Sequence, residues 1–536
     1  MLPRLTTLFM LIVLCAGLLR VDAQASFTLT VLHTNDTRAN HLPDANDVGG
    51  AARAATLIKQ IRDEVENSLL VDAGGRFTGT LFHRVYAGQD NVQIMNALGY
   101  QAMVAGSPEF DNGNLTLAQF IQNVNFPVLG ANIDTSESDV LDDLIQPSAI
   151  LTVNGEPIGV IGVTTADTPR VSSPGRDLIF SPDYRASVQT QVDALSAQGV
   201  NKIILLSYLG YDEDLDLAPL LRGVDLIVGG NTRTLLSNTH GGAVGPYPVV
   251  TAGADDAPIL IVQSGGGARG ELRYIGRIDL TFDADGLLTE WAGDTIELES
   301  SVRPDPDIAA LIDDLNEQVQ VERERPVRTA TGTQVTVAAT ATVDDCRVHE
   351  CELGNLVADG LRWRMGTQLA FVNGGAMRGG LPEGPLTRGS ILEFLPFSNR
   401  VTTFSLRGSD LVLALENGVS RVGESSGTGR FPQVSGLRYT YDLSQPTLSR
   451  IVSVEILAAD GVTYEPLDPT ATYTLATNDF VRKGGDGYQV FADRGIDPID
   501  TTVFFDDVFE SYVREHSPLT PALEGRITAL NVPPGA

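Results

Sequence analysis

The stretch Leu69-Leu70-Val71-Asp72-Ala73-Gly74-Gly75 is a short apolar segment that runs into an acidic residue and a glycine-rich loop. The same order occurs upstream, where alternating apolar residues from Phe27 to His33 lead to Asn35-Asp36, and it returns at residues 203–206 and 225–228. Apolar residues at helical spacing follow the first strand: Ala52, Ala55, Ile58 and Ile61. Strands that alternate with helices predict a mainly parallel α/β sheet, with functional side chains on loops at the strand ends.

A charged amphipathic segment separates this region from the rest of the chain. Over residues 304–324, apolar side chains recur at helical spacing: Ile308, Leu311, Ile312, Leu315 and Val319. Asp305 and Asp307 place negative charge at the positive end of the predicted helix, and Pro326 follows its charged tail. We interpret this segment as a helix that connects two domains. Beyond it we expect helices over 354–366 and 408–420 and strands over 369–372, 450–457 and 472–477.

Composition limits the classes of function. The chain has 536 residues, with 68 acidic against 37 basic side chains and a formal charge of −31. A phosphate backbone would meet like charge, so the composition argues against a nucleic-acid polymer as partner. Hydrophobic residues make up 43% of the chain, enough for several packed cores. At ~100–200 residues per domain, two to four domains are expected.

The N-terminus is typical of an export signal. A positively charged start is followed by an apolar run from Leu5 to Leu19 and by the small-residue pattern Ala23-Gln24-Ala25. We expect cleavage after Ala25, with Ala23 as the second choice. No later stretch reaches the ~18 apolar residues needed to cross a bilayer. The sequence therefore predicts an exported, soluble protein that is periplasmic, extracellular or at the cell surface.

Two cysteines remain after the predicted signal, Cys346 and Cys351. In an oxidising compartment such a pair closes a small disulfide loop. A two-cysteine metal site is the alternative, with His349 as the nearby histidine.

Nine short motifs together resemble the 5′-nucleotidase family of exported metallophosphoesterases. In the first region they are Leu32-His33-Thr34-Asn35-Asp36, Gly49-Gly50-Ala51-Ala52-Arg53, Val71-Asp72-Ala73-Gly74, Glu109-Phe110-Asp111-Asn112-Gly113 and Asp225-Leu226-Ile227-Val228-Gly229-Gly230. In the second they are Cys346-Arg347 through Gly354-Asn355-Leu356, Asn373-Gly374-Gly375-Ala376-Met377-Arg378, Leu395-Pro396-Phe397 and Gly484-Gly485-Asp486-Gly487. They occur in the family's order across about residues 30–530.

The resemblance implies an architecture with four parts. Residues 1–25 are the signal peptide, and residues 26–300 form a four-layer α/β/β/α metallophosphoesterase-like domain. Residues 301–326 form the connecting helix, which acts as a hinge in relatives. Residues 327–536 form an α/β domain that binds the substrate.

The resemblance also implies a centre with two divalent metal ions, zinc or manganese, that generate a hydroxide nucleophile. Of the seven ligand positions only Asp36 keeps the family's residue type; the other six are occupied by Arg38, Gly75, Ser107, Tyr208, Asn231 and Arg233. Pro108 stands where relatives have the catalytic histidine, and Asp111, which orients that histidine, is retained. We therefore expect no metal pair and no cofactor, and we regard Asp36 and Asp111 as vestigial catalytic residues.

Two further expectations concern the same loops. One guanidinium, from Arg38 or Arg233, should occupy the vacated metal position and pair with Asp36, because a lone buried carboxylate is costly. His41 could be a displaced metal ligand, but we interpret it as an ordinary loop histidine.

The second domain retains the family's substrate-binding residue types. By resemblance, Phe397 and Phe480 clamp the base, Asn373 contacts it, and Asp486 holds the ribose hydroxyls. Arg347 and Arg378 match the basic residues at the phosphate end, where a guanidinium fork suits phosphate oxygens. The alternative is that both phenylalanines are core residues and that the glycine loops persist only for their turns.

We therefore expect an exported, non-hydrolytic binder of nucleosides or nucleotides, a pseudoenzyme of this family. The second hypothesis is an active nucleotide phosphohydrolase with unusual ligation through Asp36, Ser107 and Asn231. The third is a scaffold or interaction protein whose pocket is inherited and unused. The sequence indicates no particular protein partner.

Overall fold

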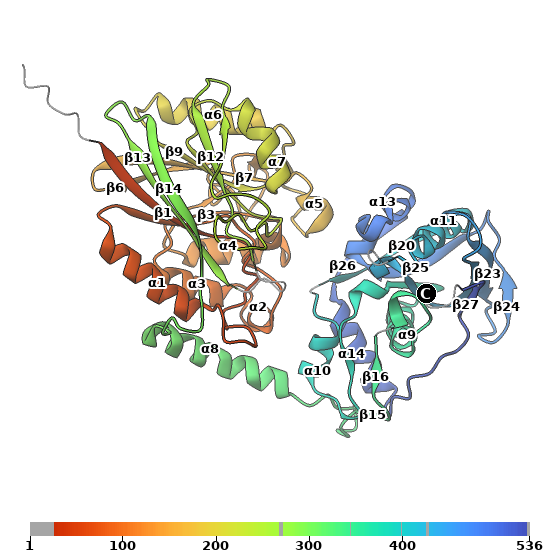
Figure 1. Cartoon of the computed structure of the whole chain (residues 1–536). Coiled ribbons are helices and arrows are strands. Elements are labelled where there is room, and N and C mark those ends of the chain that lie inside the picture. The colour runs from red at the N-terminus through yellow and green to blue at the C-terminus, as the bar shows by residue number, and fades with distance from the viewer. Residues whose placement is uncertain (1–25, 267–271, 344, 398, 425–427, 533–536) are drawn as a thin grey trace, which may run out of the picture.

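The computed structural model describes residues 26–266, 272–343, 345–397, 399–424 and 428–532 (Figure 1). The predicted export signal lies outside these residues. Two α/β bodies are joined by the helix α8, which runs along the lower edge of the first body toward the second in Figure 1. Within the described ranges, no helix is both long and apolar enough to cross a membrane.

Two six-stranded sheets form the centre of the first body. The first has the order β14-β13-β1-β2-β3-β4. Its strands are β1 (Phe27–Thr34), β2 (Ser68–Asp72), β3 (Ala102–Val104), β4 (Val128–Leu129), β13 (Tyr274–Phe282) and β14 (Leu288–Glu297). The second has the order β11-β12-β10-β9-β7-β6. Its strands are β6 (Ser148–Val153), β7 (Glu156–Thr164), β9 (Ile203–Tyr208), β10 (Leu226–Gly229), β11 (Val249–Ala252) and β12 (Pro258–Val262).

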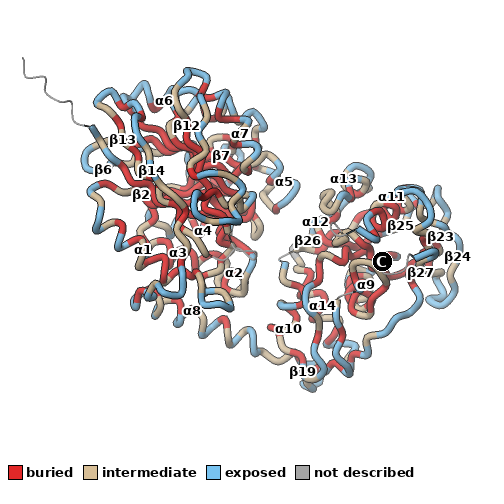
Figure 2. Tube along the Cα trace, viewed as in Figure 1, coloured by how far each residue is buried: buried red, intermediate tan, exposed pale blue. Residues whose placement is uncertain are grey.

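Side-chain alternation along β1 explains the layers. Leu29 and Val31 face the second sheet and share a core with Leu206 and Val228, whereas Leu32 faces the helices. The helices over the first sheet are α1 (Ala51–Glu64), α3 (Gln89–Leu98) and α4 (Gly113–Asn123), and those over the second are α6 (Tyr184–Ser196) and α7 (Tyr211–Leu217). The buried strands run through the middle of this body in Figure 2. The predicted α/β/β/α sandwich is confirmed.

The connecting segment is a single helix, α8 (Pro306–Glu324). The side chain of Asp305 caps it by accepting hydrogen bonds from the backbone N–H groups of Asp307 and Ile308. Four of the five apolar residues predicted to line one face are buried in the core shared with α1 and α3, and Leu311 packs partly buried against that core.

The second body is built on a mixed five-stranded sheet of order β21-β17-β25-β20-β26. Its strands are β17 (Leu369–Asn373), β20 (Arg400–Arg407), β21 (Pro432–Ser435), β25 (Thr472–Asn478) and β26 (Ile496–Phe504). Helices α9 (Glu352–Met365) and α14 (Phe505–Glu515) cover one face. The other face packs on α11 (Gly408–Val419) and on a second sheet of order β24-β23-β22-β27. These smaller strands are β22 (Leu437–Asp442), β23 (Ile451–Leu457), β24 (Tyr464–Pro466) and β27 (Ile527–Leu530).

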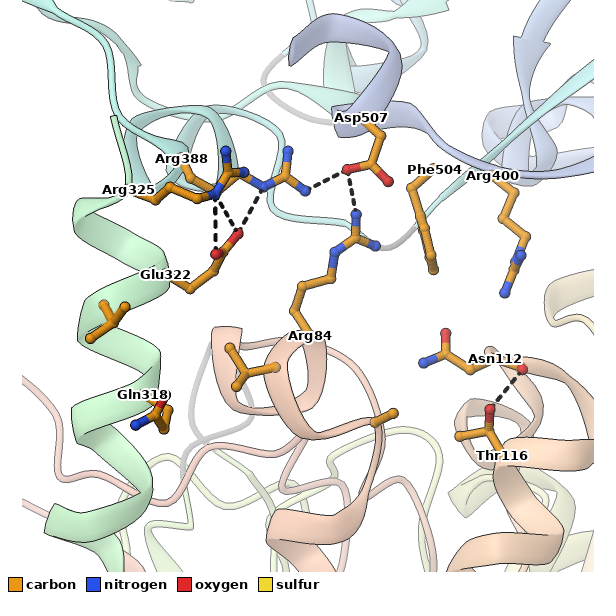
Figure 3. Close-up of a pocket in the computed structure, with 13 residues that line it drawn as sticks. Arg84, Asn112, Thr116, Gln318, Glu322, Arg325, Arg388, Arg400, Phe504 and Asp507 are labelled. Atoms are coloured by element: carbon orange, nitrogen blue, oxygen red, sulfur yellow. Dashed lines mark hydrogen bonds and ion pairs between the residues drawn. The ribbon is translucent and has the colours of Figure 1, made fainter. Parts of the chain in front are cut away.

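Ion pairs connect the two bodies beside a cavity of about 720 Å³ (Figure 3). Arg84 of α2 (Leu81–Tyr86) places its Nη2 at 2.8 Å from Asp506 and 2.9 Å from Asp507, at the start of α14. Its guanidinium carbon lies 3.8 Å from the ring centroid of Phe504. Arg388 of α10 (Arg388–Phe394) pairs with the same two carboxylates from within the second body. The second body therefore contacts the first through charged side chains as well as through α8.

Candidate functional site

The loops that would hold metals in the first body converge on Asp36, directly after β1. Asp36 is fully buried and has a backbone φ of 54°. Its Oδ1 accepts a hydrogen bond from the Tyr208 hydroxyl at 3.1 Å, and its Oδ2 accepts one from Asn35 at 3.0 Å. Burial raises the pKa of Asp36, whereas the positive charges of Arg38 and Arg233 oppose that shift. Both guanidinium groups therefore lie within electrostatic reach of this carboxylate.

Arg38 is linked to Asp36 through the hydroxyl of Tyr208 rather than by a direct ion pair. Nη2 of Arg38 donates to the Tyr208 hydroxyl at 3.3 Å, and that hydroxyl donates in turn to Asp36. The predicted direct pair between Asp36 and one of the two guanidinium groups is not made by Arg38, because the phenol of Tyr208 stands between the two charges. The hydroxyl links them as acceptor for one and donor for the other.

Tyr208, at the end of β9, fills the space between the loops. A Cβ added to Gly74 would lie 2.9 Å from Cδ2 of the Tyr208 ring, and one added to Gly106 would lie 2.8 Å from it. At Gly75 an added Cβ would lie 2.8 Å from Oδ1 of Asp36 and 3.1 Å from the Tyr208 hydroxyl. The ring is fully buried. A larger residue at Gly75 would therefore displace the Asp36 carboxylate and press on the Tyr208 hydroxyl.

Arg76 and Glu109 hold the loops after β2 and β3, and sequence reasoning missed both roles. Nε of Arg76 donates to Asp72 at 2.9 Å, and Nη2 donates to the Thr34 hydroxyl at 2.8 Å. The carboxylate of Glu109 accepts four backbone N–H groups, from Gly75, Arg76, Phe77 and Gly106. Burial raises the pKa of Glu109 to about 7, against the effect of these N–H groups. For Arg76, the sequence signal that could have indicated this role was the acidic residue four positions before it, Asp72.

The remaining positions of this centre are engaged in local contacts. The Ser107 hydroxyl bonds to that of Thr168 at 3.0 Å, and Asn231 donates to the backbone oxygen of Leu209 at 3.1 Å. His41 is buried and lies 2.7 Å from Asp90. In the described part of the chain, no three His, Cys, Asp or Glu side chains converge in a way that could hold a metal ion.

Asp111 lies where the two bodies meet. Its carboxylate accepts hydrogen bonds from the hydroxyls of Ser172, at 2.7 Å, and Thr78, at 2.9 Å. Burial raises its pKa to about 6. Its backbone oxygen accepts a long bond of 3.5 Å from Arg400 of the second body, and Lys483 of that body donates to the backbone oxygen of Ser172.

In the second body, two predicted binding residues are in direct contact. Asn373 ends β17 and donates from Nδ2 to Oδ2 of Asp486 at 2.7 Å. Asp486 lies in the loop Gly484-Gly485-Asp486-Gly487, the glycine loop, and adopts a left-handed backbone with a φ of 54°. Asn417 donates to the backbone oxygen of Asp486 at 3.2 Å and so supports this conformation.

Both predicted base-clamping rings are exposed to solvent. Phe397 and Phe480 are each 42% exposed, so the alternative that they are core residues is wrong. The guanidinium of Arg378 lies 5.0 Å from the ring centroid of Phe397. A Cβ added to Gly485 would lie 2.6 Å from three atoms of the Phe480 ring, so glycine is required for this close approach.

The two predicted phosphate-end arginines lie near each other and near Asp486. Nη1 of Arg378 donates to the backbone oxygens of Gly375 and Met377. Burial and then the positive charge of Arg347 lower the pKa of Arg378, whereas Asp486 opposes the shift. These contacts relate Arg378 to Phe397, Arg347 and Asp486, while Phe480 lies against Gly485, next to Asp486 in the chain.

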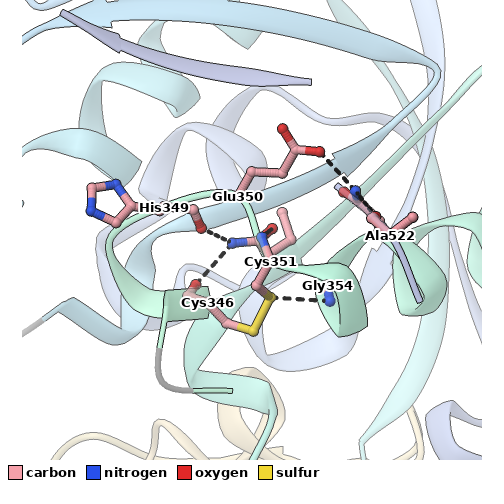
Figure 4. Close-up of a disulfide and its surroundings, with 8 residues drawn as sticks. Cys346, His349, Glu350, Cys351, Gly354 and Ala522 are labelled. Carbon is pink, nitrogen blue, oxygen red and sulfur yellow. Dashed lines mark hydrogen bonds between the residues drawn. A yellow bond between two sulfur atoms is a disulfide. The ribbon is translucent and has the colours of Figure 1, made fainter. Parts of the chain in front are cut away.

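A disulfide holds the segment that carries Arg347 (Figure 4). Cys346 and Cys351 are bonded to each other, so the disulfide prediction is confirmed over the metal-site alternative. Gln433 of β21 fastens the loop by donating to the backbone oxygens of Cys346 and His349 and accepting from the N–H of Cys351. Sulfur of Cys351 also accepts from the N–H of Gly354 in the first turn of α9.

Comparison with known proteins agrees with this architecture. Residues 327–493 match the family model described as the 5′-nucleotidase C-terminal domain. The chain is 35% identical over 549 residues to a 5′-nucleotidase of Diplobatis ommata, with 97% of this chain and 92% of that protein covered. A 5′-nucleotidase of Bos taurus is 34% identical over 550 residues, with 96% and 93% covered. The crystal structure of a 5′-nucleotidase precursor from Thermus thermophilus is 38% identical, with a TM-score of 0.70 and coverage of 95% and 100%.

Proposed function

The chain belongs to the 5′-nucleotidase family, and we propose that it binds nucleosides and nucleotides through its second domain without a dimetal phosphoesterase centre. The observation that carries the binding half is the cluster around the glycine loop. Asn373 is bonded to Asp486 there, Phe480 lies against Gly485, and Arg378 lies within electrostatic reach of Asp486 and Arg347 and beside the exposed ring of Phe397. Exposed aromatic rings provide stacking faces for any base, and guanidinium groups suit phosphate oxygens.

We also propose that the loops around Asp36 hold no pair of metal ions. Two divalent ions need several anionic or imidazole ligands at about 3.5–4 Å metal separation. Of the family's ligand positions only Asp36 offers a carboxylate, and that carboxylate already accepts hydrogen bonds from Tyr208 and Asn35. The Tyr208 ring fills the volume beside Gly74 and Gly75, and the guanidinium of Arg38 adds positive charge. The residues present do not fit a metal pair.

The domain division and the location belong to the same proposal. We assign residues 26–300 to the metallophosphoesterase-like domain, 301–326 to the connecting helix and 327–536 to the substrate-binding domain. The Cys346–Cys351 disulfide supports an oxidising compartment, and the relatives include proteins named as snake venom 5′-nucleotidases. We propose that the protein is exported, with residues 1–25 as its signal.

An active nucleotidase is the second candidate, favoured by the 35% identity to a named 5′-nucleotidase. We expect purified protein incubated with manganese or zinc to retain well under one metal ion per chain, because a single carboxylate remains among the ligand positions. We also expect no hydrolysis of AMP above the buffer control. Elemental analysis and phosphate release measure these two quantities. Two stoichiometric metals, or turnover at ~1 s⁻¹ or faster, would establish the second candidate.

The arginines at the phosphate end give a second test of the proposal. We expect Arg378→Ala to weaken AMP binding by ~10–100-fold and adenosine binding by less than ~3-fold, because only AMP offers phosphate oxygens to the guanidinium. Without metals the advantage of AMP over adenosine should be modest in the unmodified protein. Calorimetry on the full chain measures both ligands. Arg364→Ala is the matched control, since Arg364 is an exposed arginine of α9. Equal losses for the two ligands would refute the phosphate assignment.

A further inference from the structure

Asn478 connects three parts of the proposed nucleoside site, although it is fully buried itself. It is the last residue of β25 and the N-cap of the short helix α12 (Asp479–Arg482), which carries Phe480. Its Oδ1 accepts a hydrogen bond from the backbone N–H of Val481 at 2.8 Å. Its Nδ2 donates to Oδ1 of Asn373 at 3.0 Å.

These bonds determine the direction of both amides. A backbone N–H can only donate, so the group of Asn478 that faces Val481 must be its carbonyl oxygen. The NH₂ of Asn478 then faces Asn373, which must present its own carbonyl oxygen there. The NH₂ of Asn373 is thereby directed at Oδ2 of Asp486, 2.7 Å away. The chain of hydrogen bonds therefore runs from the Val481 N–H through the two amides to the Asp486 carboxylate. In each amide the oxygen accepts and the NH₂ group donates.

We propose that Asn478 is a positioning residue for nucleoside recognition, which orients the Asn373 amide and, through it, the Asp486 carboxylate. The inference rests on the proposed nucleoside binding and adds a residue that touches no ligand itself. The Asn478 side chain also caps the helix that carries Phe480. It is therefore connected to the residues proposed to contact the base (Asn373 and Phe480) and, through Asn373, to the residue proposed to bind the ribose (Asp486).

The variant Asn478→Asp separates positioning from capping. A carboxylate is as good an N-cap acceptor as the amide, so the bond from Val481 is kept. It has no N–H to donate to Asn373, and two oxygens then face each other. The Asn373 amide would turn around, and its oxygen would meet the carboxylate of Asp486. We expect the affinity of the full chain for adenosine to fall ~10-fold.

A double-mutant cycle with Asn373→Ala distinguishes this role from a merely structural one. If Asn478 acts through the Asn373 amide, N478D should change adenosine affinity by less than ~2-fold when that amide is absent. The thermal midpoint, in contrast, should fall in both backgrounds, because the new carboxylate at position 478 is buried in either case. Asn132→Asp is the matched control: Asn132 is 3% exposed in the first domain and also uses its amide on backbone groups. It should change the thermal midpoint and leave adenosine affinity unaltered.

Asn478→Ser provides a second variant in case the aspartate disrupts folding. Serine retains the capping oxygen, carries no charge and is too short to reach Asn373. It should give the same pattern with a smaller loss. Equal affinity losses with and without the Asn373 amide, or no loss at all, would overturn the positioning role while leaving nucleoside binding intact. Absence of adenosine binding by the unmodified chain would instead refute the proposed function, and this inference with it.

Discussion

Phe480→Ala is expected to weaken adenosine binding to the full chain by about 5–150-fold. Removing the ring removes one face of the proposed base stack, and such stacking contributes ~1–3 kcal/mol per base. The ring is 42% exposed, so truncation leaves no cavity in the core and the fold should persist. Titration calorimetry with adenosine measures the affinity, and circular dichroism checks that the domain remains folded.

Trp363→Ala is the matched control for this experiment. Trp363 is 44% exposed in the same domain, and its ring contacts Tyr512 of α14 and His516, directly after that helix. Its loss should leave adenosine affinity within ~2-fold of the unmodified protein, because the ring belongs to another surface. Unchanged affinity in Phe480→Ala, or an equal fall in both variants, would remove Phe480 from the binding site.

Arg76→Ala is expected to lower the free energy of unfolding of the first domain by ~3–5 kcal/mol. Arg76 is 1% exposed, and its partner Asp72 is fully buried. The substitution leaves the Asp72 carboxylate without its cation in a low-dielectric interior, and such an uncompensated charge is costly. A large effect would indicate that this internal ion pair stabilises the loops around Asp36.

The chain offers a direct readout for that measurement. Its two tryptophans, Trp291 and Trp363, lie in different domains, so a Trp363→Phe background leaves a fluorescent reporter only in the first. Arg170→Ala is the control, because the Arg170–Asp167 pair is solvent-exposed at 45% and 59% and should contribute at most ~1 kcal/mol. If urea unfolding shows less than ~1 kcal/mol for Arg76→Ala as well, the ion pair is not what stabilises these loops.

Local patterns in the sequence were sufficient to predict a mainly parallel α/β sheet and the connecting helix, whereas the four-layer α/β/β/α arrangement followed from the family resemblance. Alternation of apolar residues placed β1, and the spacing of Ile308, Ile312 and Leu315 placed α8 and its buried face. The two cysteines, five residues apart, were enough to predict the disulfide. Such patterns depend on neighbours in the chain, and burial of one face follows from periodicity.

The contacts around Asp36 could not be predicted in the same way. Tyr208 was recognised as a replaced ligand, but its ring fills the space left by glycines from other loops. Tyr208, whose phenol links Arg38 to Asp36, lies 170 positions after the arginine and 172 positions after the aspartate in the chain. Long-range packing decides which side chain enters a vacated volume, and no local pattern reports it.

The residues of the proposed binding site divide in the same way into those recognised from the sequence and those that were not. The aromatic, basic and acidic residues of the loops were recognised by resemblance, whereas Asn478 and Gln433 were not singled out. Both are buried amides that hold other residues in place. Asn478 bonds to Asn373, and Gln433 bonds to the backbone of the segment that carries Arg347. A cap position before a short helix was the only sequence signal for Asn478.

Nucleoside binding without metals is tested most simply by calorimetric titration of the full chain with adenosine, once in buffer containing EDTA and once in EDTA-free buffer with manganese. We expect one adenosine bound per chain with the same affinity in both buffers, because the proposed contacts come from side chains of the second domain alone. No binding of adenosine at millimolar concentration, or binding only in the presence of manganese, would refute metal-independent nucleoside binding.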